Sequence, residues 1–574
     1  MNNSVSANDL YDVLRSEINK GYIKKHCEVF GKLQRFSGSP DAEEAANYIL
    51  TQFQNMGASY RAYRFPGHLS RHLDASLRVI SPYQVEYDVL SCGFSGNVDN
   101  LEGELYYDYM SEKETLSQRE NKKRYSEFNG KIILTWSSAQ SLASEAKKAG
   151  ALGIITIWKF NDPVPHYLGA GTIWGNPTPD KIWQLHELPC LSCRKMDGEQ
   201  LITALKAGPV IVSMTTKVSK GITECTIPVA YIPGKSDKFV LISGHYDAHG
   251  YGMTDNGAGD AIMLELFRIL FNHQELLSRS VLLCLWSGHE DCPYAGSVWF
   301  SDNNWEMLRD RCVAHINIDV TGCRNTKQIR ARTTRMEGKS FTDKLIKEFT
   351  GREPLPYIPL PHVGEQSFLG REIPITIMFK YEAAPEDSEN VSIGGGYWWH
   401  SRDDTLDKVD YDICMRDAKI NLKAICSILN ADVLPVNMIE FTEESEHLLR
   451  EIDEHLEEEF DLSPIYPKLA ELRELLTQFV ALLPGRLDTD QAIKSIAGEL
   501  IRIQFTYRSP YEYDKLGTPS NFQKFRAAMG VTHDNTEEVP YLYILTDFIR
   551  QRNRYIGELD KIMDRIRYQI LLWK

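Results

Sequence analysis

Neither a long hydrophobic run nor a basic cluster is present in this sequence. Its 574 residues carry 64 Lys and Arg against 79 Asp and Glu, for a net charge of −15. Nucleic acids and anionic membrane surfaces bind basic patches, so this charge balance argues against both as partners. No stretch approaches the roughly 20 apolar residues of a membrane-spanning helix. We therefore expect no nucleic-acid partner and no membrane partner.

The sequence also lacks an export signal and a regular cysteine framework. Its first ten residues contain neither the basic nor the apolar segment of a secretory signal. The eleven cysteines are an odd number and are scattered, several of them in apolar runs. We therefore expect free thiols in the cytoplasm. The one Cys-x-x-Cys, Cys190 and Cys193, lacks the second pair that structural zinc usually needs.

Changes of pattern along the chain predict three parts, because 574 residues are too many for one core. Residues 1–74 and 220–432 are expected to form one discontinuous α/β domain. Residues 75–219 contain a strand–helix–strand pattern and are expected to be an inserted β/α domain. Residues 433–574 are expected to be helical. Their last stretch carries an apolar stripe that needs other helices, from the same chain or from a second one.

Strands and helices alternate between residues 225 and 430, which predicts a mixed, largely parallel sheet flanked by helices. The runs 239–242, 281–286 and 313–318 are apolar enough for buried parallel strands. In open α/β sheets, ligands bind beyond the carboxyl ends of the strands. Side chains that follow these three runs are therefore expected to lie at one edge of one sheet.

Imidazoles and carboxylates follow these predicted strands or lie in nearby turns. Any one of them has an ordinary explanation, as a solvated residue or a helix cap. Together they fall at the same predicted edge, and the set comprises His245, Asp247, Asp255, Glu290, Asp291, Asp319, His400 and Asp404. Other histidines, His289, His315 and His362, are assigned ordinary structural roles.

Two imidazoles and three carboxylates suit a pair of divalent metal ions held by nitrogen and oxygen. Two adjacent ions can share a water, lower its pKa toward neutrality and stabilise a tetrahedral intermediate. An acidic group that is not needed as a ligand can then move the proton. Glu290 beside Asp291 supplies such a group.

The order of these motifs resembles the di-zinc aminopeptidase family of metallopeptidases, whose fold glutamate carboxypeptidase II and the transferrin receptor share. The resemblance rests on His-x-Asp at 245–247, Asp-Asn-Gly-x-Gly at 255–259, the acidic pair at 290–291, Asp319, and His400 followed by Asp-Thr-x-Asp-Lys at 404–408. It implies a zinc-aminopeptidase (phosphorylase/hydrolase-like) α/β fold. Residues 75–219 resemble the protease-associated domain inserted in many members.

The resemblance implies two zinc ions per subunit and a ligand for each position. His245 and Asp319 would hold one zinc, Asp291 and His400 would hold the other, and Asp255 would bridge them. The acidic pair is Glu-Asp where Glu-Glu is commoner in the family, which shortens one ligand arm and keeps its charge.

Further roles are implied around the metals. Asp247 would bond His245 and so fix its tautomer. Glu290 would be the general base that takes a proton from a metal-bridging water and later delivers it to the leaving amine. A cis peptide is implied between Asp255 and Asn256.

The substrate pocket is less specified. Trp399 or Tyr381 could stabilise the oxyanion, and packing explains Trp399 equally well. Tyr397, Trp398 and Trp399 predict a pocket for a hydrophobic or aromatic side chain, with a role in the core as the alternative. Glu365 would favour a free α-amine over a free carboxylate.

The resemblance implies a metallopeptidase, first of all an aminopeptidase for small peptides with a hydrophobic or aromatic residue. A hydrolase of non-peptide amides or a carboxypeptidase on the same metal pair is one alternative. A binding protein without catalysis, like the transferrin receptor, is another. Residues 433–574 resemble in position the dimerisation helices of larger members, which predicts a homodimer.

Overall fold

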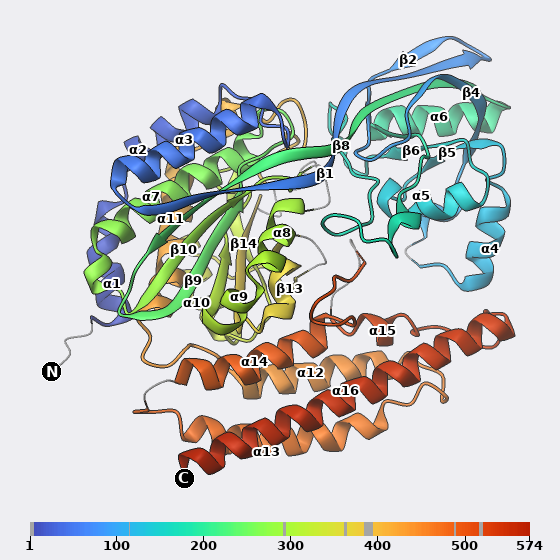
Figure 1. The fold of residues 1–574 in the computed structure, drawn as a ribbon. Helices are drawn as coiled ribbons and strands as arrows, with labels where there is room; N and C mark the ends of the chain where they lie inside the picture. Colours follow the sequence, from blue (N-terminus) through green and yellow to red (C-terminus); the bar gives the residue numbers. More distant parts are fainter. Residues whose placement is uncertain are drawn as a thin grey trace.

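The computed structural model describes residues 5–113, 115–290, 294–360, 364–383, 394–486, 489–515 and 521–574, with the backbone alone at 365–366. Figure 1 shows three parts: a sheet covered by helices, a smaller β/α unit joined to it by two long strands, and a group of helices beneath. Among the described residues, no helix combines the length and the apolar character needed to cross a membrane.

The sheet of the first part is mixed and largely parallel, as predicted. Four neighbouring strands run parallel: β14 (Ile375–Ala383), β11 (Cys312–Asn317), β9 (Ser236–His245) and β10 (Arg279–Trp286). Antiparallel strands lie on both sides, namely β12 (Thr326–Thr333) beside β14 and β8 (Ile211–Ile232) beside β10. The short β13 (Ile358–Pro359) closes the far edge.

Both faces of this sheet are buried, which explains the uninterrupted apolar character of its strands. In β9, Val240 and Ile242 face one core, whereas Phe239 and Leu241 face the other. The first core lies under α1 (Ala7–Leu14), α2 (Lys20–Phe30), α3 (Pro40–Met56), α7 (Ala258–Asn272), α10 (Lys339–Thr350) and α11 (Tyr411–Leu429). The second lies under α8 (Ala295–Asn303) and α9 (Trp305–Arg311).

Two long strands link the sheet to the inserted unit. β1 (Ser59–Ser81) and β8 pair antiparallel along nearly their whole length, with irregularities between His72 and Asp74 and between Val79 and Ser81. The predicted boundaries at 74 and 219 thus fall inside continuous strands. The insert adds β2 (Val85–Tyr87), β3 (Val89–Ser91), β4 (Val98–Tyr107), β5 (Lys131–Thr135), β6 (Gly153–Ile157) and β7 (Cys190–Cys193), with α4 (Gln118–Ser126), α5 (Ala139–Lys148) and α6 (Lys195–Ala207). Cys190 and Cys193 are buried in β7, where burial raises the pKa of both thiols.

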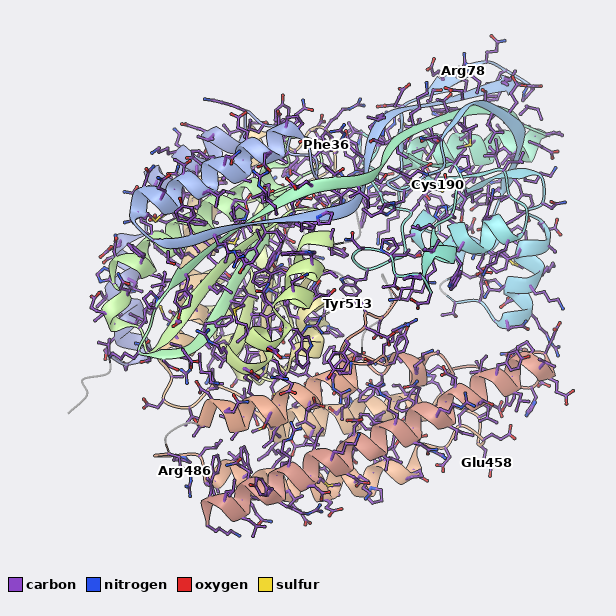
Figure 2. All side chains as sticks on the ribbon, in the orientation of Figure 1. Phe36, Arg78, Cys190, Glu458, Arg486 and Tyr513 are labelled. Atoms are coloured by element: carbon purple, nitrogen blue, oxygen red, sulfur yellow. The ribbon has the colours of Figure 1, made fainter. Side chains whose placement is uncertain are left out.

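The helical part contains α12 (Met438–Asp453), α13 (Tyr466–Ala481), α14 (Thr489–Phe505), α15 (Gln523–Arg526) and α16 (Glu538–Trp573). The apolar stripe of α16 packs against α13 and α14, so it finds partner helices within its own chain. α14 fastens this part to the sheet domain through Asp490, which accepts hydrogen bonds from Arg279 at 2.7 Å. Tyr513 lies where the three parts meet (Figure 2). Its ring stacks on Trp174 of the insert, and its hydroxyl bonds Asp302.

Candidate metal centre

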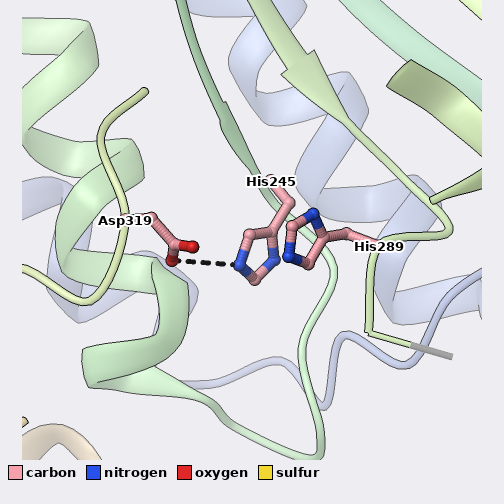
Figure 3. A group of neighbouring side chains, drawn as sticks. All are labelled: His245, His289 and Asp319. Carbon is pink, nitrogen blue, oxygen red and sulfur yellow. Dashed lines mark hydrogen bonds and ion pairs between the residues drawn. The ribbon is translucent and has the colours of Figure 1, made fainter. Parts of the chain in front are cut away.

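The carboxyl ends of the parallel strands bring the predicted side chains together. His245 is the last residue of β9, and Asp319 follows the end of β11 by two residues. The His245 Nε2 atom lies 3.2 Å from Asp319 Oδ1 and 3.0 Å from Asp255 Oδ1. Figure 3 shows Asp319 on one side of the His245 ring and His289 on the other. The edge predicted from the sequence therefore holds an imidazole whose Nε2 faces two carboxylates.

Asp255 lies between two imidazoles. Its Oδ1 faces His245, and its Oδ2 is 3.4 Å from His400 Nε2. The peptide bond between Asp255 and Asn256 is cis, which confirms the geometry that the resemblance implies. Gly252 allows the loop to fold tightly here, because it has a φ of +46° and a Cβ would lie 2.3 Å from the Asp255 carbonyl oxygen.

The second half of the centre contains His400 and Glu290. The His400 Nε2 atom lies 3.0 Å from Glu290 Oε2. Asp291, the other predicted ligand here, lies outside the described residues. Asp404 supports the loop below: its carboxylate accepts the backbone N–H groups of Thr254 at 2.9 Å and of Asp255 at 3.1 Å.

The imidazoles of His245 and His400 are oriented in the same way. His245 donates its Nδ1–H to the backbone carbonyl of Asp247 at 2.9 Å. His400 donates its Nδ1–H to the backbone carbonyl of Tyr167 at 3.3 Å. Metal-binding histidines are usually held by such a bond at the second nitrogen, which leaves the other lone pair for the metal. Both Nε2 atoms therefore face the carboxylates.

Buried carboxylates lie close together at this centre, which favours the binding of cations. Burial, followed by the negative charge of Asp255, raises the pKa of Glu290 to about 7. Burial lowers the pKa of His400, but the carboxylates of Glu290 and Asp255 outweigh it and raise that pKa to about 10. Among the described residues, Asp255 Oδ1 and Glu290 Oε1 have no hydrogen-bond partner. Without a metal, the proton on His400 Nε2 places positive charge between the carboxylates of Glu290 and Asp255, and a bound cation would replace it.

The donor set fits zinc. Three groups of ligand atoms, each within 4.8 Å of one another, lie here: His245, His289 and Asp319; His249, Glu290 and His400; and His245, Asp255 and Glu290. The donors are imidazole nitrogens and carboxylate oxygens, which are ligands that zinc accepts. His245, Asp319, Asp255 and His400 would hold the ions.

Asp247 acts differently from the prediction. Its carbonyl, not its carboxylate, fixes the tautomer of His245, because the Oδ1 to Nδ1 distance is 3.8 Å. The buried carboxylate instead accepts hydrogen bonds through Oδ2 from Ser37 at 2.5 Å and from the backbone N–H groups of His289 at 2.9 Å and Glu290 at 3.1 Å. Asp247 thus positions the turn that carries Glu290.

Three residues at the centre were missed by the sequence analysis. His289, assigned an ordinary structural role, stacks on His245 with ring centroids 4.0 Å apart. His249 lies with its Nε2 3.9 Å from Glu290 Oε2. Arg35 is fully buried and donates to the carbonyls of Phe30, Tyr246 and Gly252 at 2.8 to 3.0 Å. Of these three residues, only His249 could have been found from the sequence, because it lies two residues after Asp247.

Some of the predicted pocket residues lie at the centre and others do not. Trp399 stacks on His400 with centroids 3.5 Å apart, so it lies at the centre. Trp398 is buried, and Tyr397 packs on its edge. The hydroxyl of Tyr381 is buried and accepts a hydrogen bond from Asn421 on α11. In this geometry it does not stabilise an oxyanion, contrary to the prediction. The Glu365 side chain and the whole of His362 lie outside the described residues. His315 has the ordinary role assigned to it: it is buried beside Ser243, at 2.8 Å.

Solved structures of peptidases share this α/β fold. An aminopeptidase from Aneurinibacillus sp. strain AM-1 superposes with a TM-score of 0.55 at 18% identity, over 72% of this chain and 94% of that one. A peptidase M28 precursor from Shewanella amazonensis SB2B gives 0.57 at 17% identity, over 75% and 97%. These similarities establish the fold.

Residues 229–425 match the model of peptidase family M28. A probable glutamate carboxypeptidase, VP8, of Zea mays is 29% identical over 137 residues, which are 23% of this chain and 19% of that protein. Aminopeptidase YwaD of Bacillus subtilis (strain 168) is 24% identical over 213 residues, which are 37% and 44%. The chain thus matches less than half the length of either relative.

Proposed function

We propose that this protein is a co-catalytic di-zinc exopeptidase, and specifically an aminopeptidase that hydrolyses small peptides with a hydrophobic or aromatic N-terminal residue. The observation that carries the proposal is the position of Glu290. This carboxylate is buried beside His400, at 3.0 Å, while its second oxygen has no hydrogen-bond partner in the described part of the chain. A carboxylate held this way can exchange a proton with a reacting group.

His245 and Asp319 would bind one zinc, His400 and Asp291 the other, and Asp255 would bridge both. When bound, two zinc ions polarise the scissile carbonyl and lower the pKa of water. Glu290 accepts a proton from the attacking water and returns it to the leaving amine. In the metal-free protein burial raises the pKa of Glu290 to about 7, and bound zinc ions would lower it, which keeps Glu290 ionised as a base near neutral pH. His249, whose Nε2 is 3.9 Å from Glu290 Oε2, donates a hydrogen bond to the substrate carbonyl as negative charge develops there.

The preference for a hydrophobic residue rests on Trp399 and Tyr397, which precede His400 in the sequence. The insert, which resembles a protease-associated domain, restricts access to the centre, because its Tyr167 ring stacks on His249 at 4.9 Å. Small substrates are therefore favoured. A hydrolase of non-peptide amides or a carboxypeptidase is the second candidate, since the relatives include proteins named as aminopeptidase and as probable glutamate carboxypeptidase.

A panel of amides tests these candidates. Zinc-loaded protein is assayed on peptides with a free N-terminus, a blocked N-terminus or a blocked C-terminus, and the released amino acids are measured. Hydrolysis that requires a free N-terminus supports the aminopeptidase. Turnover only of N-blocked substrates favours the second candidate, and zinc binding without turnover of any amide favours a receptor-like binding protein.

The role of Glu290 is tested by Glu290→Gln, which should retain both zinc ions and lose kcat by orders of magnitude. Glu337→Gln is the matched control. Burial likewise raises the pKa of Glu337 to about 7, but this residue follows β12 at the opposite edge of the sheet. A wild-type kcat in Glu290→Gln would show that Glu290 is not the general base.

A homodimer formed through residues 433–574 is part of the proposal. It is supported by exposed apolar side chains on α16, namely Val539, Leu542, Tyr543, Tyr568, Leu571 and Leu572. Sedimentation at micromolar concentration should give twice the mass of the chain, and a monomer would remove this part. The cytoplasmic location is also proposed. The ten described cysteines are free thiols, which is compatible with a reducing compartment.

A further inference from the structure

The insert touches the metal centre directly. A loop that follows β6 runs from Trp158 to Tyr167 and lies against Trp399 and His400. Tyr167 donates its backbone N–H to the His400 carbonyl at 2.7 Å and accepts the His400 Nδ1–H through its own carbonyl. This pair of bonds holds the backbone and the side chain of a ligand at the same time.

A second residue of the loop strengthens this attachment. The Nδ1–H of His166 donates to the Trp399 carbonyl at 2.6 Å. The Nε2 atom of His166 lies 2.9 Å from Asp162 Oδ2, and the same carboxylate oxygen accepts the indole N–H of Trp158 at 2.7 Å. His166 and Asp162 are both buried, so water does not compete for the hydrogen bond from His166 to the Trp399 carbonyl. His166 is thereby held rigidly against the residue that precedes the ligand.

A series of stacked rings connects the loop to the side chain of His400. His166 stacks on Trp158 at 4.3 Å, Trp158 stacks on Trp399 at 6.1 Å, and Trp399 stacks on His400 at 3.5 Å. His400 has a φ of +52°, in the left-handed region, which residues other than glycine, asparagine and aspartate adopt at a cost. The bonds from Tyr167 and His166 offset that cost and select this backbone conformation.

We propose that the insert is a structural part of the metal centre, and that His166 and Tyr167 are positioning residues for His400. The centre is asymmetric in this respect. His245 is oriented by Asp247, two residues away in the same domain, whereas His400 is oriented by a loop from the insert. Loosening the loop should therefore weaken one metal position and spare the other. This inference rests on the two-zinc site of the proposed function.

The test compares metal affinities in full-length protein. His166→Leu removes the bond to the Trp399 carbonyl and the contact with Asp162. His166→Asn keeps a donor near the position of Nδ1. His186→Leu is the matched control, because His186 is a second buried histidine of the insert, bonded to Ala170 within the insert at 2.9 Å. Co²⁺ is titrated into metal-free protein, and the visible absorption resolves the two binding steps. Zinc per chain is measured after dialysis, and far-UV circular dichroism checks folding.

In His166→Leu, one binding step should weaken about 10- to 100-fold while the other keeps its wild-type affinity, since partners of metal ligands change affinity by about this much. His166→Asn should recover most of the loss, and His186→Leu should match the wild type. Wild-type affinity at both positions in His166→Leu would overturn the inference. Equal weakening of both positions, or the same loss in His186→Leu, would also overturn it, because either indicates general loosening.

These outcomes are separable from failure of the proposed function. Wild-type protein that binds no zinc or cobalt removes both proposals. Wild-type protein that binds two ions without hydrolysing any amide removes the proposed function alone, because the affinities still report on His166.

Discussion

Replacing Arg35 should destabilise the protein and loosen the metal centre together. Arg35 lies between α2 and α3, and its fully buried guanidinium donates to three backbone carbonyls. Two of them, those of Tyr246 and Gly252, lie in the loop between His245 and Asp255. The same guanidinium offsets the charges of the buried carboxylates Asp260, Asp404 and Asp247. Arg35 thus braces the loop that carries two ligands.

The magnitude follows from these contacts in Arg35→Met. Methionine keeps much of the apolar volume, so cavity formation contributes little. Three buried carbonyls lose a donor, at about 1 to 1.5 kcal/mol each, and buried carboxylates lose a compensating charge. The expected loss is about 3–5 kcal/mol in the free energy of unfolding. Arg35→Lys should be nearly as destabilising, because one ammonium cannot replace a planar fork that reaches three carbonyls.

Urea unfolding followed by tryptophan fluorescence measures the loss, and cobalt titration measures the affinity of the centre. Arg61→Met is the control, because Arg61 is exposed on β1 over the ring of Tyr63, and should change stability by less than about 0.5 kcal/mol. An Arg35→Met protein within that margin of the wild type, with unchanged metal affinity, would refute the account of Arg35.

Three further outcomes are expected. Burial lowers the pKa of His26 to about 4. Between pH 6.5 and 4 the unfolded chain therefore binds more protons than the folded protein. The free energy of unfolding is at its full value above pH 6.5 and falls as the pH is lowered through this range. The loss is ~3 kcal/mol, and urea unfolding at several pH values should show that His26→Phe has a flatter dependence than the wild type over this range. His249→Phe keeps an aromatic ring beside Tyr167 but removes both ring nitrogens and the N–H donor. Steady-state kinetics should give a kcat about 10- to 100-fold lower with the zinc content unchanged, and a drop in zinc content would instead make His249 a ligand. Removing zinc with a chelator should lower the free energy of unfolding, and restoring zinc at 100 times its dissociation constant should return about 2.7 kcal/mol per position, whereas an unfolding curve independent of zinc would contradict a metal centre here.

Much of the centre follows from local pattern and one rule of topology. Three apolar runs predict buried parallel strands, and parallel strands end at one edge, so His245, Asp319 and Glu290 meet there. The glycines around Asp255 indicate a tight loop, which Gly252 requires through its positive φ. These features depend on residues near one another in the chain.

Other features depend on contacts between distant segments. The hydroxyl of Tyr381 accepts a hydrogen bond from Asn421, 40 residues away, and the hydrophobic pattern of the sequence does not predict that partner. Which oxygen of Asp247 orients His245 depends on where Ser37 and the Glu290 turn lie. The apolar stripe of α16 predicts a helical partner, but only the packed structure shows that α13 and α14 of the same chain fill it.

The sequence by itself determined the strands, the sheet edge and the type of chemistry, because hydrophobic period and residue type act over short stretches of chain. Only the tertiary structure decided that Arg35 braces the loop from 211 residues away and that the insert holds His400 across 233 residues. Hydrogen bonds between buried groups are set by the final packing of all segments at once. A sequence pattern supplies the donors and acceptors, and folding decides which of them meet.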